Sequence, residues 1–223
     1  MKSSISVVIP ALDEESWLAA AIRSVRAQAE VLVVDGGSRD ETRAVAAAEG
    51  AVVLQTPPGR GRQLDAGARA ARGEWLVFLH ADTRLEAGWS EALDALPADV
   101  VGGAFRLAID SPGAGFRCLE MGVRARVRLL RLPYGDQALF ARREAYERIG
   151  GMPHLPLMED VAFVGRLRRA GRLAFLRPRA FTSPRRWERH GLVGATLRNW
   201  WLLLLYAMGH PPARLAQRYR PAP

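Results

Sequence analysis

Short apolar runs alternate with amphipathic stretches through the first 80 residues, and this alternation constrains the fold more than any other feature of the sequence. The runs are rich in Val, Ile and Leu, which is typical of buried strands, whereas the stretches between them carry a helical period. The expected strands are residues 5–9, 31–34, 52–54 and 75–79, and the expected helices are residues 14–28, 40–49 and 63–72. Such a pattern predicts an α/β fold, with βαβ units around a mainly parallel sheet and helices on both faces.

The second half of the chain has a less regular pattern. Extended segments are expected at residues 104–109 and 138–141, and helices at residues 116–130, 143–149, 161–170 and 192–208. Near the start of the chain, Asp13 is expected to cap the first helix and Gly50 to end the second. No internal repeat and no linker rich in Pro, Gly or Ser divides the sequence, so its 223 residues are expected to form one domain.

Positive charge is concentrated toward the C-terminus. Residues 161–223 contain thirteen arginines and one carboxylate, Glu188, in a chain whose net charge is +9. Such a block attracts anionic lipid, nucleic acid or a phosphorylated ligand. The alternative is a solvated, arginine-rich surface, which is favoured by the fact that Lys2 is the only lysine.

The cysteine count and the apolar segments indicate where in the cell the protein is expected. Cys118 is the only cysteine and no secretory signal is visible, so a reducing, cytoplasmic setting is expected. The longest apolar stretch, residues 200–208, is too short to span a membrane, which needs about 20 helical residues. Its tryptophans and arginine-rich flanks are typical of a helix at a membrane interface, here the inner face, and a buried core helix is the alternative.

Two loops that follow expected strands carry residues suited to nucleotide binding. The first strand leads into Pro10-Ala11-Leu12-Asp13-Glu14, and the second into Asp35-Gly36-Gly37-Ser38. Ligands of open α/β sheets bind beyond the carboxyl ends of the strands, so both loops should face one crevice. Asp35 could accept a hydrogen bond from a base N–H or a ribose hydroxyl, and Gly37 allows close approach of the backbone. An aspartate that only stabilises a turn is the alternative.

A third strand end carries a candidate metal site. His80 and Asp82 follow the strand at residues 75–79 and, two positions apart in an extended segment, point the same way. A carboxylate there can hold Mg²⁺ or Mn²⁺ against a diphosphate and neutralise the charge that grows on a leaving group. A purely structural His–Asp pair is the alternative.

Two later segments add candidate acidic and phosphate-binding groups. Glu159 and Asp160 open the helix at residues 161–170, where they are either caps or, in an enzyme, a source of a general base. The segment Ser183-Pro184-Arg185-Arg186-Trp187 places two guanidinium groups beside an indole. Arginine forks bind phosphate oxygens, and the indole could close over a base or sugar, whereas a surface cation–π pair is the alternative.

Taken in chain order, these segments resemble the family-2 glycosyltransferases, inverting enzymes with the GT-A fold. The segments that carry the resemblance are Val7-Val8-Ile9-Pro10-Ala11-Leu12-Asp13-Glu14-Glu15, Val33-Val34-Asp35-Gly36-Gly37-Ser38-Arg39-Asp40, Gly67-Ala68-Arg69-Ala70-Ala71-Arg72-Gly73, Phe78-Leu79-His80-Ala81-Asp82-Thr83, Phe140-Ala141-Arg142-Arg143-Glu144, and Gly150-Gly151-Met152 followed by Glu159-Asp160. The combination of His80-Ala81-Asp82, residues 133–137 and residues 183–187 looks closest to short bacterial members associated with radical-SAM/selenodomain proteins. The resemblance spans nearly the whole chain and implies a nucleotide-sugar-binding half (1–110), an acceptor and catalytic half (111–190) and a basic, amphipathic C-terminal helix and tail (191–223).

The resemblance implies a hexosyltransferase that moves a sugar from a nucleotide-diphosphate sugar, with UDP favoured, to an acceptor hydroxyl. Asp160 would be the catalytic base with Glu159 beside it, and Asp82 would hold Mg²⁺ or Mn²⁺ together with His80. The donor-site residues that it implies are Pro10, Ala11, Glu14, Asp35, Gly37, Arg62, Ala81, Asp82, Asp136, Gln137, Arg186 and Trp187. Residues 200–208 add the expectation of a lipid-linked acceptor and a peripheral membrane contact. No nucleic-acid partner is expected, and the sugar, the acceptor and the oligomeric state stay open.

Two departures from the family pattern matter. His80 replaces the first carboxylate of the family's Asp-x-Asp motif, which lowers the negative charge at the ion and leaves metal identity and metal dependence open. Ser183 stands where processive members carry the Gln of Gln-x-x-Arg-Trp, so polymer synthesis is not expected. The alternatives are a related sugar nucleotidyltransferase, which would need a lysine after the first strand, and a non-enzymatic basic module that binds anionic membrane or RNA.

Overall fold

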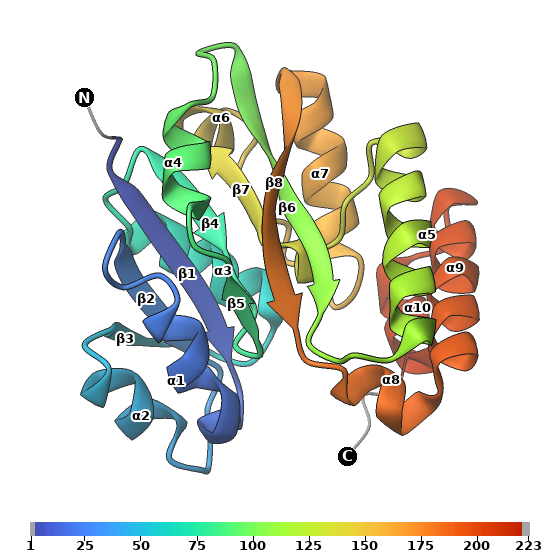
Figure 1. The fold of residues 1–223 in the computed structure, drawn as a ribbon, viewed down its shortest axis with the longest axis horizontal. Coiled ribbons are helices and arrows are strands. Elements are labelled where there is room, and N and C mark those ends of the chain that lie inside the picture. The colour runs from blue at the N-terminus through green and yellow to red at the C-terminus, as the bar shows by residue number, and fades with distance from the viewer. Residues whose placement is uncertain (1–2, 220–223) are drawn as a thin grey trace.

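The computed structural model describes residues 3–219 of the chain. Within these residues, eight strands form one sheet in the order β3-β2-β1-β4-β7-β6-β8-β5 (Figure 1). The strands are β1 (Ile5–Ala11), β2 (Glu30–Asp35), β3 (Val52–Gln55), β4 (Trp75–Phe78), β5 (Thr83–Leu85), β6 (Val100–Ile109), β7 (Leu139–Arg142) and β8 (Arg172–Thr182). The helices are α1 (Glu15–Arg23), α2 (Thr42–Ala48), α3 (Arg60–Ala70), α4 (Trp89–Asp94), α5 (Ala114–Leu130), α6 (Arg143–Arg148), α7 (Glu159–Ala170), α8 (Arg185–His190), α9 (Leu192–Ala207), α10 (Pro212–Arg218) and the 3-10 turn η1 (Gly135–Gln137).

The amino-terminal part of the sheet is parallel, as the sequence predicts. β1 lies between β2 and β4, with Val8 opposite both Leu32 and Phe78. Val8 is fully buried because both faces of the sheet are covered, so an unbroken apolar run is stable there instead of an alternating one. The antiparallel strand β7 joins β4 to β6, and four of the seven strand pairings are parallel. The mainly parallel α/β architecture is therefore confirmed.

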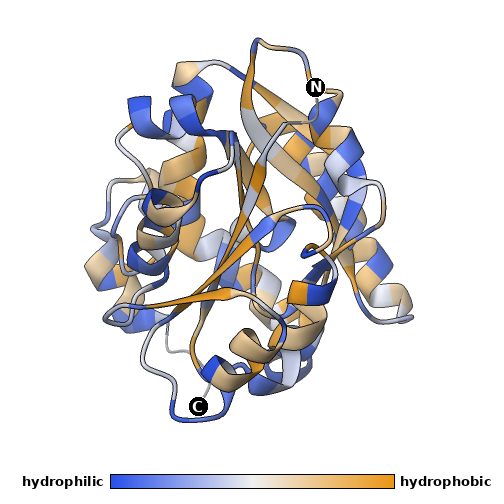
Figure 2. Cartoon of the chain, turned by 90° about the vertical axis from the view of Figure 1, so that its left-hand side faces the viewer, coloured by the Kyte–Doolittle hydropathy of each residue, from blue (hydrophilic) through white to orange (hydrophobic). Residues whose placement is uncertain are grey.

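Helices cover both faces of the sheet and divide the core into two layers. On one face, α1, α2 and α4 enclose a cluster that includes Trp75 and Trp89. On the other face, α3, α6 and α7 enclose a cluster that includes Leu64, Tyr146 and Phe163. Figure 2 shows the apolar residues concentrated along the strands and hydrophilic residues on the outer helices. The two rigid layers support the loops at the carboxyl ends of the strands, where a site can form.

The helices α5, α9 and α10 group together at one side of the molecule (Figure 1). One face of α9 buries Leu202 and Leu205 in a cluster with Leu157 and Leu215. The other face leaves apolar side chains such as Trp201 exposed to solvent. Residues 200–208 thus belong to a helix that is part core and part exposed apolar surface. Between residues 3 and 219, no helix has both the length and the apolar character needed to cross a membrane.

The first helix is shorter than predicted and begins without the expected cap. α1 ends at Arg23, and the chain continues in turns up to β2. Asp13 has a positive φ of 54°, and its carboxylate accepts a hydrogen bond from the Arg39 N–H (2.8 Å). The cap prediction is therefore wrong, because Asp13 ties two loops together instead of binding the helix.

Several elements after β4 were not expected from the sequence: β5, α4, β8, α8 and α10. β8 is the longest strand at 11 residues, yet Arg177, Pro178 and Arg179 interrupt its apolar pattern. Its stability comes from long-range pairing, since it runs parallel to β6 with Ala180 opposite Leu107. The β6–β8 ladder also contains two register shifts. Such an element is specified by its neighbours in space and not by its own periodicity.

Candidate active site

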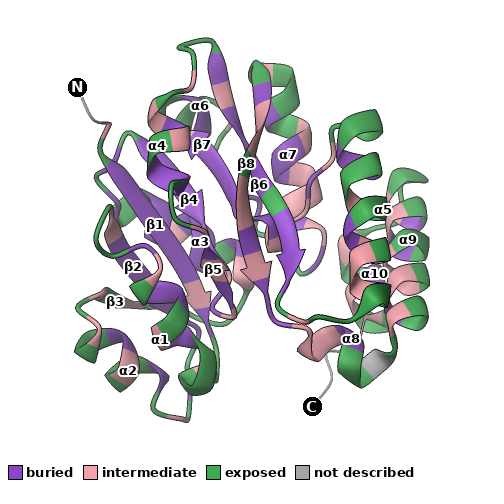
Figure 3. Ribbon diagram, viewed as in Figure 1, coloured by how far each residue is buried: buried purple, intermediate pink, exposed green. Residues whose placement is uncertain are grey.

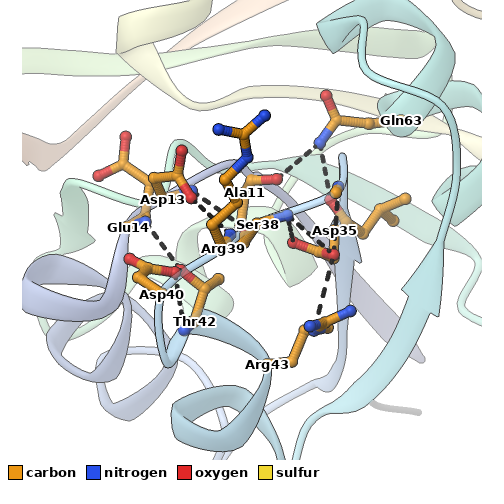
Figure 4. Close-up of polar contacts among 12 residues, drawn as sticks. Ala11, Asp13, Glu14, Asp35, Ser38, Arg39, Asp40, Thr42, Arg43 and Gln63 are labelled. Atoms are coloured by element: carbon orange, nitrogen blue, oxygen red, sulfur yellow. Dashed lines mark hydrogen bonds and ion pairs between the residues drawn. The ribbon is translucent and has the colours of Figure 1, made fainter.

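The loops that follow β1 and β2 form one hydrogen-bonded unit at the carboxyl edge of the sheet (Figure 4). Asp35 at the end of β2 is fully buried, and its carboxylate accepts hydrogen bonds from the N–H groups of Gly37 (3.2 Å) and Ser38 (3.1 Å). Arg43 on α2 lies 4.0 Å from the same carboxylate. The loop after β1 joins this unit because the N–H of Asp13 donates to Ser38 Oγ (3.0 Å). The loops after β1 and β2 are thereby joined into one corner at the edge of the sheet, and Asp35 is the buried carboxylate of this corner.

Gln63 on α3 closes this corner from the other side. Its Nε2 donates to the backbone oxygens of Ala11 (2.9 Å) and Val34 (2.8 Å) (Figure 4). These oxygens belong to residues at the carboxyl ends of β1 and β2, and the Ala11 oxygen also accepts a hydrogen bond from the Gly36 N–H (2.9 Å). Gln63 thereby fixes the position of α3 relative to both strand ends.

A cleft of about 550 Å³ opens beyond the strand ends. Its walls come from the loop after β1, the loop after β4, the start of α3, the segment before α7, and α8. The residues predicted from the sequence that line it are Pro10, Ala11, Glu14, His80, Ala81, Asp82, Glu159 and Arg186. The fold therefore gathers in one cleft eight residues that lie as much as 176 positions apart in the chain.

Arg185 holds the two acidic side chains of the cleft. Its Nε donates to Asp82 Oδ2 (2.9 Å), and its Nη2 donates to Glu14. Burial raises the pKa of Glu14, although the hydrogen bond and charge of Arg185 act in the opposite direction. Glu14 Oε2 is buried and has no hydrogen-bond partner among the residues that the structure describes. The cleft thus contains the Arg185 guanidinium between two carboxylates. It also contains one carboxylate oxygen, Glu14 Oε2, that accepts no hydrogen bond from the described residues.

His80 lies in the same cleft as a neutral base. Burial, together with the positive charges of Arg60, Arg186 and Arg185, lowers the pKa of its imidazole well below the usual value. A neutral imidazole has a lone pair available for a metal ion. Within residues 3–219, no group of three or more His, Cys, Asp or Glu side chains could hold a metal. His80 and Asp82 would therefore supply two protein ligands, and the remaining ligands would have to come from a bound anion and water.

A smaller chamber adjoins the cleft and shares Arg60, His80 and Arg186 with it. Asp160, at the start of α7, lines this chamber. Its Oδ2 accepts a hydrogen bond from the Gly135 N–H (2.8 Å), and its Oδ1 accepts one from the Val161 N–H (2.8 Å). Two backbone donors therefore orient the carboxylate. An oriented carboxylate beside a charged cleft is the arrangement that a general base requires.

The 3-10 turn η1 lies close to the predicted base, Asp160, and to the predicted metal ligand, His80, through Gly135. A Cβ at this position would lie 2.9 Å from His80 Nε2 and 3.5 Å from Asp160 Oδ2. Only a residue without a side chain lets the turn approach both groups this closely. The neighbouring residue, Asp136, lines the chamber and not the cleft. Burial raises the pKa of Asp136, and its Oδ1 is buried with no hydrogen-bond partner among the described residues.

Glu159 has a different environment from Asp160. Its side chain is buried and forms an ion pair with Arg60. Burial lowers the pKa of Arg60, but the charges of Glu159 and Asp160 raise it by more, so the guanidinium stays charged. Because Arg60 neutralises Glu159, Asp160 is the better-placed base of the two.

Five of the predicted site residues lie outside the cleft and the chamber: Asp35, Gly37, Arg62, Gln137 and Trp187. Asp35 and Gly37 form the corner behind it, and Arg62 is exposed on α3. The buried side chain of Gln137 bonds to Phe105 O (3.2 Å) and holds η1 in place. Trp187 is buried beside Ile109 and packs edge-on against Phe116, with 6.3 Å between the ring centroids. The structure therefore does not bring its indole to the cleft.

Sequence reasoning missed three residues of the site: Arg60, Gln63 and Arg185. The helical period would have found the first two, because positions 60 and 63 share one face of α3 whereas Arg62 lies on another. Arg185 belonged to a recognised motif, but its contact with Asp82 spans 103 positions in the sequence. No local signal specifies such a pairing.

Comparison with known proteins gives the family. The model of the family described as Glycosyl transferase family 2 matches residues 6–153. An uncharacterized glycosyltransferase of Mycobacterium tuberculosis is 37% identical over an alignment of 161 residues, and the match covers 66% of this chain and 71% of the relative. The matched segment contains the strand ends after β1 and β4, which line the cleft, and the end of β2, which forms the corner behind it.

Solved structures agree on the fold. The crystal structure of S. aureus TarS, residues 1–349, matches 81% of this chain with a TM-score of 0.62 and 17% identity, and the chain spans 61% of that structure. Glucosyl-3-phosphoglycerate synthase from Mycobacterium tuberculosis, in complex with Mn²⁺, UDP and glucosyl-3-phosphoglycerate, matches 94% of this chain with a TM-score of 0.63 and 24% identity, and the chain spans 81% of it. The predicted GT-A fold is therefore confirmed. These matches favour a transferase over a basic binding module or a nucleotidyltransferase, and the chain belongs to glycosyl transferase family 2.

Proposed function

We propose that this protein transfers a sugar from a UDP-sugar to an acceptor hydroxyl with inversion at the anomeric carbon. The observation that carries the proposal is the junction of two cavities. The cleft holds the acidic and basic groups that a nucleotide diphosphate and its metal need, and the chamber holds Asp160. The cavities share His80, Arg60 and Arg186, so a sugar at this junction would lie between the diphosphate and the base.

The nucleotide would bind at the corner formed by the loops after β1 and β2. Pro10, Ala11 and Glu14 line the cleft at this corner, and Asp35 and Gly37 stand directly behind it. The proposal is supported by the M. tuberculosis synthase, which has the same fold and was crystallised with UDP. Arg185 and Arg186 would bind the diphosphate oxygens, since guanidinium groups bind phosphate through paired hydrogen bonds.

Asp82 and His80 would hold the divalent cation, Mg²⁺ or Mn²⁺. The chemistry of this pair fits, because a carboxylate and a neutral imidazole are both ligands that Mn²⁺ accepts. When bound, such a cation neutralises the negative charge that develops on the leaving diphosphate. The synthase crystallised with Mn²⁺ supports this assignment.

Asp160 would remove the proton from the acceptor hydroxyl. The hydroxyl oxygen forms the new bond to the anomeric carbon, the bond from that carbon to the diphosphate breaks, and UDP leaves with the electron pair. The hydrogen bonds from Gly135 and Val161 keep the carboxylate oriented while it accepts the proton. Protonation of the leaving group is unnecessary, because a metal-bound diphosphate is already a stable anion.

The proposal extends to the setting of the enzyme. The exposed apolar side of α9 and the arginines of residues 161–223 support an acceptor carried by a lipid and a peripheral contact with the cytoplasmic face of a membrane. Membership of the short bacterial radical-SAM/selenodomain-associated subgroup is part of the same proposal. It is supported by His80-Ala81-Asp82 and by the segments around η1 and α8.

Ligand-induced stabilisation tests the donor site. UDP with Mn²⁺ at a hundred times its Kd should stabilise the protein by about 2.7 kcal/mol, which raises Tm measurably. Asp82→Asn should remove the part of this shift that depends on Mn²⁺, whereas Asp110→Asn, which changes an exposed partner of Arg84, should leave it unchanged. A shift that is equal in the wild type and in Asp82→Asn would exclude Asp82 from the site.

Donor hydrolysis tests the base. Release of UDP from a panel of UDP-sugars, with water as acceptor, should fall in Asp160→Asn by a factor of about 100 to 10,000, the usual contribution of a general base. The UDP-induced rise in Tm should persist in that variant, because the Asp160 carboxylate lies in the chamber and not in the cleft. Loss of UDP binding together with activity would contradict the assignment of Asp160 as base.

A further inference from the structure

A third cavity, of about 300 Å³, lies between α5 and α9 and leads to the catalytic chamber. The two spaces share three lining residues: Tyr134, Asp136 and Asn199. The donor cleft, the chamber and this α5–α9 cavity therefore follow one another, with the chamber in the middle. A molecule in the α5–α9 cavity would reach Asp160 from the side opposite the donor.

Polar and apolar residues are divided between the two ends of the α5–α9 cavity. Tyr134, Asp136 and Asn199 lie where it meets the chamber. Most of the remaining lining is apolar and includes Leu107, Leu119, Val123, Leu192, Leu197 and Trp200. Ligand sites with this division bind molecules that have a polar head and an apolar body.

The apolar end of the cavity opens to solvent. Val193, Leu197 and Trp200 line it and are 66%, 63% and 46% exposed. Figure 3 shows that much of α5 and α9 is exposed. Exposed apolar side chains grouped around an opening are typical of a surface that binds an apolar partner. An apolar chain that enters the cavity would cover these side chains.

The polar end of the cavity contains a carboxylate oxygen that has no hydrogen-bond donor among the described residues. Asp136 Oδ1 is buried and has no hydrogen-bond partner among the described residues. Buried polar atoms are almost always paired, so an unpaired one at the meeting point of two cavities points to a missing ligand group. A hydroxyl group would satisfy Asp136 and would lie in the chamber that Asp160 lines.

We propose that the α5–α9 cavity binds the alkyl or prenyl chain of the acceptor, with the chain's hydroxyl-bearing head at Asp136 and Asp160. This inference rests on the proposed function and adds the acceptor class, a single-chain amphiphile. It also assigns a role to the segment of α9 that sequence analysis singled out. The donor enters through the cleft, and the acceptor enters between α5 and α9.

The single cysteine provides the measurement. Cys118 is exposed, lines the cavity and is the only cysteine in the sequence, so thiol labelling reports on this site alone. The full-length protein is treated with 5,5′-dithiobis(2-nitrobenzoate) in the presence of 1-alkanols of four to ten carbons, below their solubility limits. We expect protection of Cys118, with affinity that rises about fourfold for each added methylene.

Two glycines give a matched pair of variants. Gly122 on α5 lines the cavity, and a Cβ built there meets no atom within 4 Å, so the side chain of Gly122→Leu begins in open space at the cavity wall. Gly165 on α7 is equally open but does not line the cavity. We expect Gly122→Leu to weaken alkanol protection at least tenfold and Gly165→Leu to leave it unchanged. Equal protection in both variants, or no dependence on chain length, would overturn the inference.

Two further outcomes separate this inference from its alternatives. Protection of Cys118 that appears without alkanol and grows with protein concentration would identify a second copy of the chain as the occupant and would overturn the inference. The rise in Tm caused by UDP and Mn²⁺ should be the same in wild type and Gly122→Leu, because the donor cleft is a separate space. If UDP and Mn²⁺ did not raise the Tm of the wild type, the proposed function would be overturned instead.

Discussion

Arg185 occupies the position in the donor cleft where a cation is needed. It donates hydrogen bonds to both Asp82 and Glu14, so the two carboxylates share one positive charge before any ligand binds. For Asp82 to hold a metal, Arg185 must exchange this carboxylate for another anion. The diphosphate of the donor is such an anion, which couples metal binding to nucleotide binding.

Replacement of Arg185 should therefore shift two affinities in opposite directions. In Arg185→Ala, Mn²⁺ alone should bind more tightly because Asp82 and Glu14 lose their competing cation. UDP in the presence of Mn²⁺ should bind about tenfold or more weakly, since a hydrogen bond to a charged group contributes about 1.5–3 kcal/mol. Titration calorimetry measures both, with Arg84→Ala, an exposed partner of Asp110, as the control. A UDP affinity equal to that of the wild type would contradict this role of Arg185.

The neutral state of His80 gives stability a dependence on pH. Burial and the charges of Arg60, Arg186 and Arg185 lower the pKa of His80 well below its usual value of 6.5. The native state therefore keeps the ring neutral while the unfolded chain takes up a proton as pH falls through about 6.5. The contribution of His80 to stability is complete above this pH. Below it, the contribution falls by up to about 1.4 kcal/mol per pH unit.

Urea unfolding at pH 7.5 and 5.5 isolates this contribution. Burial raises the pKa of Glu14 and of Asp136, so these two groups stabilise the native state as pH falls and oppose the effect of His80. The comparison must therefore be between variants. We predict that His80→Asn loses less stability than the wild type between the two pH values, whereas His210→Asn, an exposed control, behaves like the wild type. Identical pH dependence in all three proteins would show that His80 is not held neutral by the fold.

At the scale of elements, the turn η1 positions the proposed base. Its backbone N–H at Gly135 orients Asp160, and the missing side chain leaves room for His80. We predict that Gly135→Ala lowers the rate of UDP-sugar hydrolysis at least tenfold, because a Cβ 2.9 Å from His80 Nε2 requires either the imidazole or the turn that orients Asp160 to shift. The rise in Tm caused by UDP and Mn²⁺ measures whether the variant still binds the nucleotide in the donor cleft.

Gly165→Ala is the matched control for this variant. Gly165 lies within α7 with open space around its Cβ position, so alanine there should stabilise the helix by about 0.5–1 kcal/mol and leave the rate unchanged. If Gly135→Ala were as active as Gly165→Ala, the turn would have no role in orienting the base.

The elements that the sequence predicted and those that it missed differ in what stabilises them. β1 and β2 are continuous apolar runs buried between two helical layers, so each carries its own signal. β8 lacks this signal because Arg177 and Pro178 break its pattern, and its place depends on pairing with β6. The short elements β5 and α4 contain too few residues to show a period.

The same distinction holds in the site. Asp82 and Asp160 were predicted because strand ends and helix starts mark them locally, and the structure places them in adjoining cavities. The resemblance implies Arg62 as a donor-site residue, but Arg62 is exposed on α3 and Arg60 lines the cleft instead. The motif that ends in Arg186-Trp187 predicts Trp187 at the donor site, but the order of residues in a motif does not specify where a side chain points. In the structure, α8 directs Trp187 into an apolar cluster. Sequence locates the elements of the site, and packing decides which side chains reach it.

At the scale of the molecule, charge and apolar surface lie in the same part of the chain. Residues 161–223 carry twelve more positive than negative charges, from thirteen arginines and one glutamate. The outer side of α9 exposes Trp201 and Leu204, at 55% and 51%, and Met208, which directly follows the helix, is 58% exposed. An apolar surface flanked by arginines binds the interface of an anionic membrane through burial and charge together. Such a contact would bring the mouth of the α5–α9 cavity to the lipid that carries the acceptor.

Vesicle flotation tests this contact with the whole protein. We predict that the protein floats with vesicles that contain phosphatidylglycerol and stays in solution with neutral vesicles, because the arginines need an anionic surface. Raising the salt from about 0.05 M to about 0.5 M should weaken binding, since the Debye length shortens. The triple variant Trp201→Ser, Leu204→Ser, Met208→Ser should bind at least tenfold more weakly, whereas Val52→Ser, on the edge strand β3, should bind like the wild type. Equal flotation of the wild type and the triple variant would show that α9 does not face the membrane, and the acceptor would then have to leave the lipid before it reaches Asp160.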